Sequence, residues 1–444
     1  MRIVLPKLTT LSPTADVAPQ PLAAPASLTE WPGAAIMDDP VTARVLFSVW
    51  SGDSAVVVPS PPGAGKTRLV CLLAAALAHR ADLRVGIAAQ TREQALEIAR
   101  RLGGLTDRAG LMWKTGVGKP NCGSTPVVTG QRARWRSDGG SILLATTAKW
   151  MFSDPDRLGA DVLIVDEAWQ CTYADLGALG AIARQVVCVG DPGQIDPVVT
   201  GDVTRWLSSA TAPDLPAPIA LQAAHGDAVG VLRRSRDDDI GVVRLRHTWR
   251  LGAETTALIQ PVFYPDLPFT SRRPPEHLCE ASGSVVPELG HRVVAVSGGA
   301  SDPALIDTCA GRARELLDTA VHTESGGRPL TAADIAVVVP HVTQAAAIRA
   351  LLADHPDMLV GTANSLQGLE RTAVVTLHPL AGYRTAESFN LDLGRACVML
   401  SRHRAHMTVI TDAASIDVLA QTEPGSSQAA NSGLLNSLHG TSAV

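Results

Sequence analysis

The chain has 444 residues, of which 46% are hydrophobic and 18% are charged, and its formal net charge is −5. This composition excludes a wholly disordered or fibrous chain, and the length predicts two or three domains of roughly 100–200 residues. The longest apolar run, residues 69–78, is shorter than the roughly 18 residues needed to cross a bilayer, so we expect no membrane contact.

Seven cysteines are scattered singly, without a Cys-x-x-Cys pair. This pattern argues against a zinc ribbon or a disulfide framework and favours a reduced, cytoplasmic compartment. Because the chain is slightly acidic, any nucleic acid would have to contact a local basic patch.

Residues 1–30 are rich in Pro, Ala, Thr and Ser and show no apolar period, which predicts a disordered leader. Beyond them, short apolar runs alternate with helical stretches, as in parallel β-α-β units whose strands are buried on both faces. The predicted strands are 55–58, 84–88, 141–145, 162–165 and 186–189, followed by 293–296, 335–339, 358–361, 373–377 and 407–411. The predicted helices include 68–79, 92–102, 303–319 and 344–353.

Strand signals are scarce between residues 205 and 290, where Pro and Asp are frequent. We therefore predict an α/β protein with a first lobe over 31–245, a junction over 246–290 and a second lobe over 291–420. Residues 421–444 have the composition of a flexible tail.

A phosphate-binding loop is predicted at residues 60–67, where SPPGAGKT follows a strand and precedes a helix. Gly63 and Gly65 would let backbone N–H groups surround phosphate oxygens, with Lys66 at the β/γ-phosphates and Thr67 on Mg²⁺. Ser60 occupies the position of the usual first glycine. The predicted nucleotide-binding residues of this segment are Ser60, Gly63, Ala64, Gly65, Lys66, Thr67 and Arg68.

An acidic pair, Asp166 and Glu167, follows the apolar run VLIV. Such a pair suits Mg²⁺ coordination by the aspartate and activation of the attacking water by the glutamate. An acidic turn that caps a helix is the alternative. Together with the phosphate loop, the pair predicts a nucleoside triphosphatase.

Further motifs follow in order: GDPGQIDP with Gln194, HTWR with Arg250, GTANSLQGLE over 361–370 and LSRHR with Arg402. With the DEAWQ segment, this series resembles superfamily 1 helicases, specifically the 1B branch of RNA- and DNA-dependent ATPases with DEAxQ and GDPxQLPP motifs. The resemblance covers about residues 40–412 and is that of a divergent, compact member.

The resemblance implies two tandem RecA-like lobes with parallel sheets that close on one ATP–Mg²⁺. By the resemblance, Gln194 would sense the γ-phosphate, and Arg250 and Arg402 would act as arginine fingers. Trp249 would stack on the base, and Glu370 would contact the ribose. A surface salt bridge is the alternative for each arginine, and remains open for Arg404. The catalytic residues would be Lys66, Asp166, Glu167, Gln194, Arg250 and Arg402.

The glutamine that reads adenine in this family has no counterpart in the upstream stretch DDPVTARVLFSVW, so the range of accepted nucleotides stays open. The resemblance also places a single strand across both lobes, held through its phosphates. The candidate contacts are Thr91, Thr146, Thr147, Thr362, Ser365 and Gln367. For each threonine, a helix cap is the alternative.

The interval of about 103–140 interleaves Lys and Arg with Trp113 and Trp135 and is nearly free of acids. Basic and aromatic residues together favour strand binding, so this segment is predicted as a small accessory insert in the first lobe; a solvated basic loop is the alternative.

The sequence thus predicts an ATP-dependent translocase or helicase on single-stranded nucleic acid, moving 5′ to 3′ by the family resemblance. We expect DNA, although RNA discrimination depends on 2′-hydroxyl contacts that no motif fixes. The alternatives are an RNA helicase, an ATPase that remodels protein–nucleic acid complexes without unwinding, a catalytically inactive binding module and a metabolite kinase.

Overall fold

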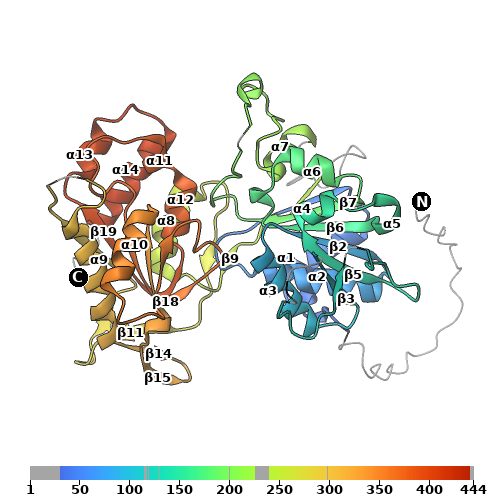
Figure 1. Ribbon diagram of the computed structural model, residues 1–444, viewed down its shortest axis with the longest axis horizontal. Helices are drawn as coiled ribbons and strands as arrows, with labels where there is room; N and C mark the ends of the chain where they lie inside the picture. Colours follow the sequence, from blue (N-terminus) through green and yellow to red (C-terminus); the bar gives the residue numbers. More distant parts are fainter. Residues whose placement is uncertain are drawn as a thin grey trace, which may run out of the picture.

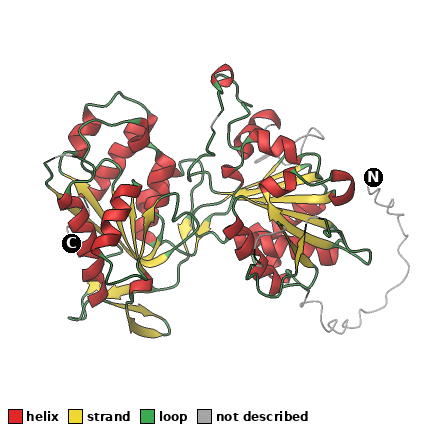
Figure 2. Ribbon diagram, in the orientation of Figure 1, coloured by secondary structure: helices red, strands yellow, loops and turns green. Residues whose placement is uncertain are grey.

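The computed structural model describes residues 31–114, 118, 120–129, 131–199, 201–225, 240–297 and 299–440. The predicted leader over 1–30 lies outside the described residues. Two lobes lie side by side and are joined by extended segments (Figure 1). In each lobe, strands form a sheet between layers of helices (Figure 2). The predicted α/β class with two lobes built on parallel sheets is confirmed.

The first lobe contains an eight-stranded sheet in the order β4-β3-β5-β2-β6-β7-β1-β8, and all its neighbouring strands are parallel. Every strand predicted in this lobe lies within an observed one. The strands are β1 (Ala55–Pro59), β2 (Arg84–Ala89), β3 (Ala109–Trp113), β4 (Val127–Thr129), β5 (Ser141–Thr146), β6 (Ala160–Asp166), β7 (Ala183–Gly190) and β8 (Gly241–Val242).

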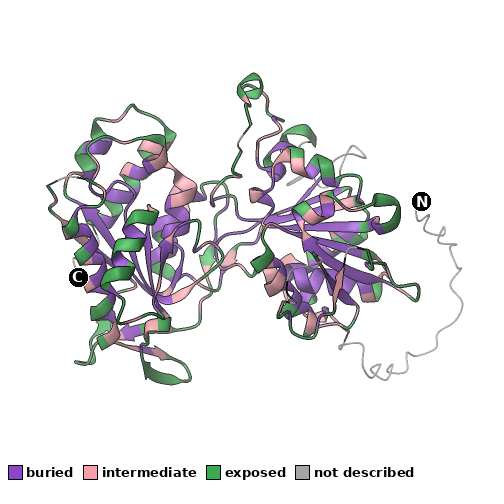
Figure 3. Cartoon of the chain, viewed as in Figure 1, coloured by how far each residue is buried: buried purple, intermediate pink, exposed green. Residues whose placement is uncertain are grey.

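Helices cover both faces of this sheet and bury its strands (Figure 3). Helices α1, α2 and α3 form one apolar core with it, and α4, α6 and α7 contribute to the core on the other face. The helices are η1 (Ala34–Met37), α1 (Pro40–Trp50), α2 (Lys66–Arg80), α3 (Arg92–Gly103), α4 (Thr147–Met151), α5 (Pro155–Leu158), η2 (Ala168–Gln170), α6 (Tyr173–Leu179), η3 (Thr204–Trp206) and α7 (Ala217–His225).

The predicted accessory insert is the main point where this lobe differs from expectation. Strands β3 and β4 lie within the interval of about 103–140 and extend the main sheet at its edge, in parallel with β5. The buried side chains of Leu111 and Met112 belong to the cores on the two faces of the sheet. The interval is therefore part of the lobe, and its prediction as a separate insert was wrong.

The second lobe has a five-stranded sheet in the order β13-β19-β18-β16-β17, again with parallel neighbours. A four-stranded antiparallel sheet, β12-β11-β14-β15, lies beside it. Before this lobe, β9 (His247–Thr248) pairs in parallel with β10 (Thr270–Ser271). The lobe's other strands are β11 (Glu276–Cys279), β12 (Val285–Val286), β13 (Leu289–Val294), β14 (Ala320–Thr323), β15 (Gly326–Pro329), β16 (Ile335–Val339), β17 (Leu359–Thr362), β18 (Arg371–Leu377) and β19 (His403–Asp412).

Helices α9 and α10 form one core with the larger sheet, and α8, α12, α13 and α14 form the other. The lobe's helices are α8 (Ala253–Phe263), α9 (Pro303–Glu315), η4 (Leu316–Asp318), η5 (Ala332–Asp334), α10 (Val342–Leu351), α11 (Ser388–Leu391), α12 (Leu393–Met399), α13 (Ser415–Ala420) and α14 (Ser426–His439). No helix of the described chain is long and apolar enough to span a membrane.

Two predicted boundaries of this lobe were wrong. Helix α8 lies in the predicted junction over 246–290, yet Leu258 and Ile259 pack in the same core as α14. The predicted flexible tail over 421–444 contains α14, in which Leu434, Leu435 and Leu438 are fully buried. The second lobe therefore begins near residue 253 and extends through 439.

Candidate nucleotide cleft and strand path

The predicted phosphate-binding loop connects β1 to α2, at the carboxyl edge of the first sheet. Gly63 and Gly65 have φ values of 71° and 85°, a backbone region in which other residues are strained. A Cβ atom on Gly63 would lie 2.4 Å from the Cβ of Arg250. Glycine is thus required at this position because the chain that enters the second lobe packs directly on the loop. Ser60 is fully buried, and its hydroxyl donates to the Val58 carbonyl.

Lys66 lies at the start of α2 and is largely buried. Its Nζ is 3.5 Å from Oδ2 of Asp191, a fully buried carboxylate at the end of β7. The amide of Gln194 donates to the same oxygen over 2.7 Å. The lysine predicted to bind phosphate therefore shares an anionic partner with the predicted γ-phosphate sensor.

Asp166 is the last residue of β6 and Glu167 follows it, next to the strand that leads into the loop of Asp191. Glu167 has a φ of 50°, which is uncommon for a residue with a side chain and turns the chain sharply after the strand. The Oδ1 atom of Asp166 is buried and has no hydrogen-bond partner among the described residues. Burial and the neighbouring Glu167 carboxylate raise the pKa of Asp166.

A buried carboxylate oxygen without a partner fits an Mg²⁺ ligand, since oxygen atoms are the donors that this ion prefers. Thr67, the other predicted ligand, follows Lys66 and is partly exposed. No group of three or more His, Cys, Asp or Glu side chains suited to a metal occurs in the part of the chain described here. An Mg²⁺ at this place would thus complete its coordination with nucleotide and water oxygens.

The arginine of HTWR lies between the lobes. The guanidinium of Arg250 donates to the Glu370 carboxylate through Nε and to the Ser401 carbonyl through Nη1. The preceding residue, Trp249, donates its backbone N–H to the Gly63 carbonyl over 2.9 Å. The predicted ribose contact, Glu370, is therefore an ion-pair partner of Arg250 here, and that pair lowers the pKa of the carboxyl even though burial opposes it.

Arg402 is 2% exposed and follows α12 in the second lobe. Its guanidinium donates to the Val398 carbonyl and the Ser401 hydroxyl, and no carboxylate among the described residues forms an ion pair with it. Burial and the charge of Arg250 lower the pKa of Arg402 to about 10. A buried cation without a counter-ion is costly, which points to an anion as its missing partner. By contrast, Arg404 pairs with Glu276, as the salt-bridge alternative predicted.

The lobes are in direct contact beside these groups. The side-chain amide of Gln367 donates to Oε1 of Gln194 over 3.0 Å. A Cβ on Gly394 would lie 2.7 Å from the carbonyl oxygen of Gln194, so α12 packs closely on the loop of the first lobe. Tyr264, from the end of α8, donates its hydroxyl to Asp191 over 2.7 Å. The cleft is therefore built from side chains of both lobes.

A cavity of about 480 Å³ lies beside the phosphate loop. Ala64, Gly65, Arg68 and Trp249 line it, as their predicted role in nucleotide binding requires. Asp38 and Asp39, from the stretch that lacks the adenine-reading glutamine, line it as well. Because the indole of Trp249 is 55% exposed, a base in this cavity could stack on it.

The residues of the first lobe that are predicted to contact nucleic acid lie where β2 and β5 end. Thr91 and Thr146 accept hydrogen bonds from the backbone of Gln94 and Lys149 and cap α3 and α4. Thr147 is 6% exposed, and its hydroxyl donates to the Ala89 carbonyl and the side chain of Gln90. The predicted strand contact of Thr147 was therefore wrong, because its hydroxyl faces the interior of the lobe.

On the second lobe, Thr362 ends β17 and is joined to Ser365 by hydrogen bonds that close a local turn. Gln367 follows in the same loop and contacts Gln194. This loop therefore connects the residues of the second lobe that are predicted to contact nucleic acid to Gln194, the predicted γ-phosphate sensor of the first lobe.

Three residues of the cleft were not among the predicted ones. Asp191 was visible in GDPGQ, but its pairing with Lys66 was not. Tyr264 has no motif around it. The side-chain amide of Gln90 donates to the Asp166 carbonyl over 3.2 Å, and its oxygen accepts from Thr147. The position of Gln90 beside a predicted strand contact was the only available signal.

Comparisons with known proteins give the following similarities. Residues 44–217 match a family model described as an AAA domain. No curated protein sequence matches the chain.

Among solved structures, the chain is similar to the PRRSV helicase, with 17% identity and a TM-score of 0.41 over 84% of this chain and 54% of that one. It is also similar to arterivirus nonstructural protein 10, a helicase, alone (14% identity, TM-score 0.43, 81% and 59% coverage) and in complex with DNA (16%, 0.43, 81% and 61%). The chain spans little more than half the length of these proteins.

The AAA match covers the phosphate loop, the acidic pair and the loop of Gln194. The remaining motifs follow in the segment between the lobes and in the second lobe, and lie in one cleft with them. The first lobe accordingly carries a segment similar to the AAA domain family, and side chains of the second lobe meet it at the cleft.

Proposed function

We propose that this protein hydrolyses ATP with Mg²⁺ between its two lobes and uses the reaction to move along single-stranded nucleic acid as a helicase. The main support is the surroundings of Asp191, where Lys66 and Gln194 of one lobe meet Tyr264 of the other. The unpaired guanidinium of Arg402 lies close enough to interact electrostatically with this carboxylate.

The charges of the cleft suit phosphoryl transfer. Lys66 would exchange Asp191 for the nucleotide's phosphates, and Arg402 would acquire in them the anion that its buried charge lacks. Arg250 would add a second positive charge, stabilising the transition state. Thr67 and Asp166 would hold Mg²⁺, which would supply further positive charge at the phosphate oxygens. Glu167 is the candidate base that orients the attacking water.

Coupling to a strand would follow two hydrogen-bonded routes. One runs from Gln194 to Gln367, next to the predicted strand contacts Thr362 and Ser365. The other runs from the Asp166 carbonyl through Gln90 to Thr147, at the edge that carries Thr91 and Thr146. Through these contacts, a change at the phosphates would alter the loops that face the strand.

The direction and the type of strand rest on the family resemblance, which favours 5′ to 3′ movement, and on our expectation of DNA. The same cleft would also serve an RNA helicase, or an ATPase that remodels protein–nucleic acid complexes without unwinding. We therefore keep them as alternatives to be separated by experiment.

The test is ATP turnover titrated with single-stranded DNA and with RNA, followed by displacement of the shorter strand from duplexes with a 5′ or a 3′ overhang. We expect stimulation by single strands and displacement from the 5′-overhang duplex. Stimulation without displacement would support the remodelling ATPase, and turnover that ignores both strands would contradict the proposal. Repeating the titration with all four nucleoside triphosphates would show what the cavity at Trp249 accepts.

A further inference from the structure

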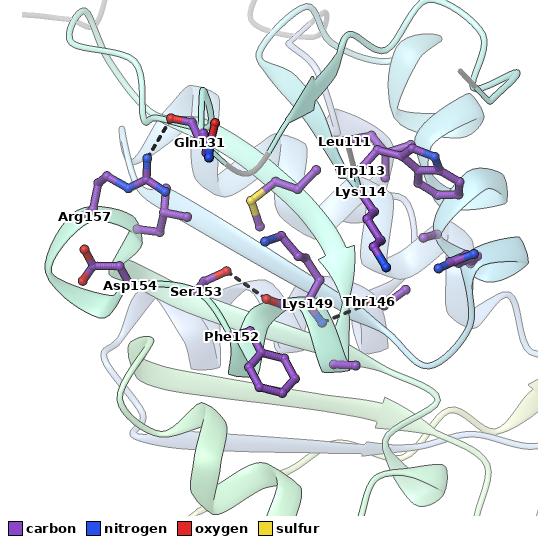
Figure 4. A pocket seen from close by; sticks show the side chains of 15 residues that line it. Leu111, Trp113, Lys114, Gln131, Thr146, Lys149, Phe152, Ser153, Asp154 and Arg157 are labelled. Atoms are coloured by element: carbon purple, nitrogen blue, oxygen red, sulfur yellow. Dashed lines mark hydrogen bonds between the residues drawn. The ribbon is translucent and has the colours of Figure 1, made fainter. Parts of the chain in front are cut away.

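A second, larger cavity of about 780 Å³ lies on the first lobe where β3 and β5 end. It is lined by residues at the end of β3, by α4, and by the turn that follows α4 (Figure 4). The cleft described above does not use it. Most of its lining residues come from the basic interval, from the helix that Thr146 caps and from the turn after that helix.

The cavity carries an excess of positive charge. Arg92, Lys114, Lys149 and Arg157 line it, whereas Asp154 is the only acid among its lining residues. In Figure 4, Lys114 and Lys149 extend into the space between Trp113 and Arg157. Such a surface in an acidic protein is complementary to a polyanion.

Two aromatic side chains lie among these cations. The phenyl ring of Phe152 is 88% exposed, which is unusual for so large an apolar group. Trp113 is partly buried, and the guanidinium of Arg92 lies 5.8 Å from the centre of its ring. Aromatic faces next to cations suit unpaired bases, because a base can stack on the ring while its phosphates contact the cations.

The cavity also lies in line with the predicted strand path. The sheet order β6-β2-β5-β3 places Asp166, Thr91, Thr146 and Trp113 along one edge in that sequence. Asp166 and Trp113 lie at the two ends of this series, three β-strand spacings or about 14 Å apart. A single-stranded nucleic acid that passes Thr91 and Thr146 and continues in the same direction would therefore reach the cavity.

We propose that this cavity is a nucleotide subsite for the single strand, in which a base stacks on Phe152 and the flanking phosphates contact Lys114 and Lys149. The inference rests on the proposed function, because it needs a strand on the first lobe. It adds a contact that depends on length: a strand must extend beyond Thr146 to use it. The contact is independent of sequence, as every base offers an aromatic face.

The test measures the affinity of fluorescent oligothymidylates of increasing length for the wild type and for Phe152→Ala. For oligonucleotides long enough to reach the cavity, we expect the variant to bind about tenfold more weakly, in line with the loss of one stacked base. Shorter oligonucleotides should bind both proteins alike, and Phe152→Trp should restore the affinity of the long ones.

The ionic contacts are tested through salt. Loss of one phosphate contact in Lys149→Ala should lower the slope of log affinity against log salt by about one. Phe47→Ala and Arg44→Ala are matched controls, because both residues are exposed on α1 and line none of the cavities described above. Both controls should bind every oligonucleotide as the wild type does.

Two negative results are distinguishable. If the wild type binds and is stimulated by strands while Phe152→Ala and Lys149→Ala match it at every length and salt concentration, the subsite is wrong and the proposed function stands. The same result would direct attention to a protein ligand for this surface. If the wild type binds no single strand at all, both proposals fail.

Discussion

The hydroxyl of Tyr264 lies 2.7 Å from Oδ1 of Asp191, and this hydrogen bond joins the second lobe to the carboxylate that pairs with Lys66 in the first. The phenol ring fits closely here, since a Cβ on Gly193 would lie 2.5 Å from its Cζ. Burial raises the pKa of Tyr264, so the hydroxyl stays protonated and can donate. Tyr264 is thus placed to position Asp191 whenever Lys66 moves.

We predict that Tyr264→Phe lowers strand-stimulated kcat about tenfold and changes the KM for ATP little, because a hydrogen bond to a charged group contributes about 1.5–3 kcal/mol. The ring would still pack against Phe269, so folding should persist. Steady-state turnover with and without strand measures the effect. Tyr383→Phe is the matched control, as its hydroxyl contacts His341 within the second lobe. A proportional rise in KM would contradict a positioning role.

Lys66→Ala and Glu167→Gln should both abolish strand-stimulated turnover. The first removes the cation next to Asp191, and the second removes the candidate base without changing the volume of the side chain. Neither group supports a core, so the far-ultraviolet circular dichroism spectrum should match that of the wild type. Full turnover in either variant would refute the assignment of the cleft.

The sequence predicted best what depends on local chain properties. Strands buried on both faces, such as β16, are uninterrupted apolar runs and were located directly. Strand β4 escaped prediction because it has three residues and lies at the sheet edge. Helix α14 escaped because Ser, Asn and Gly dominate its sequence, while tertiary packing buries its few leucines.

The same division applies to the cleft. Lys66, Asp166 and Gln194 lie in motifs whose spacing is visible along the chain. The contact of Tyr264 with Asp191 depends on how two lobes pack, and the pairing of Arg250 with Glu370 joins residues 120 positions apart. No local pattern encodes such contacts.

Arg402→Met should separate function from stability. The wild-type guanidinium is buried, forms no ion pair among the described residues and lies near Arg250, so its replacement should leave the free energy of unfolding unchanged or raise it by about 1 kcal/mol. Turnover should fall by about 10³-fold or more, as for other arginine fingers. Chemical denaturation and steady-state assays measure the two effects.

The control for Arg402→Met is Arg312→Met. Arg312 is also buried, but it contacts Glu315, Thr408 and His406 within the second lobe. Its replacement should lower the free energy of unfolding by about 1–3 kcal/mol, since it leaves buried partners unsatisfied. If Arg402→Met destabilises the protein as much as Arg312→Met, Arg402 is a structural residue.

Acid should unfold the second lobe before the first. Burial lowers the pKa of His291 to about 4 and those of His378 and His406 to about 3, and all three lie in the second lobe. In the unfolded chain, histidine titrates at about 6.5. Between the folded-state pKa values and 6.5, these histidines bind more protons in the unfolded state than in the folded state. The stability of the second lobe that is present above pH 6.5 is therefore lost as the pH falls below that value.

The positions of the tryptophans make this loss measurable. All eight lie between residues 31 and 249, so their fluorescence reports the first lobe and the junction, whereas circular dichroism reports both lobes. Near neutral pH, the two thermal transitions should lie close together. At pH 5, we expect the dichroism to decrease at a lower temperature than the fluorescence changes. Replacement of His378 by Leu should reduce this separation, and transitions that coincide at every pH would contradict the assignment of acid sensitivity to the buried histidines.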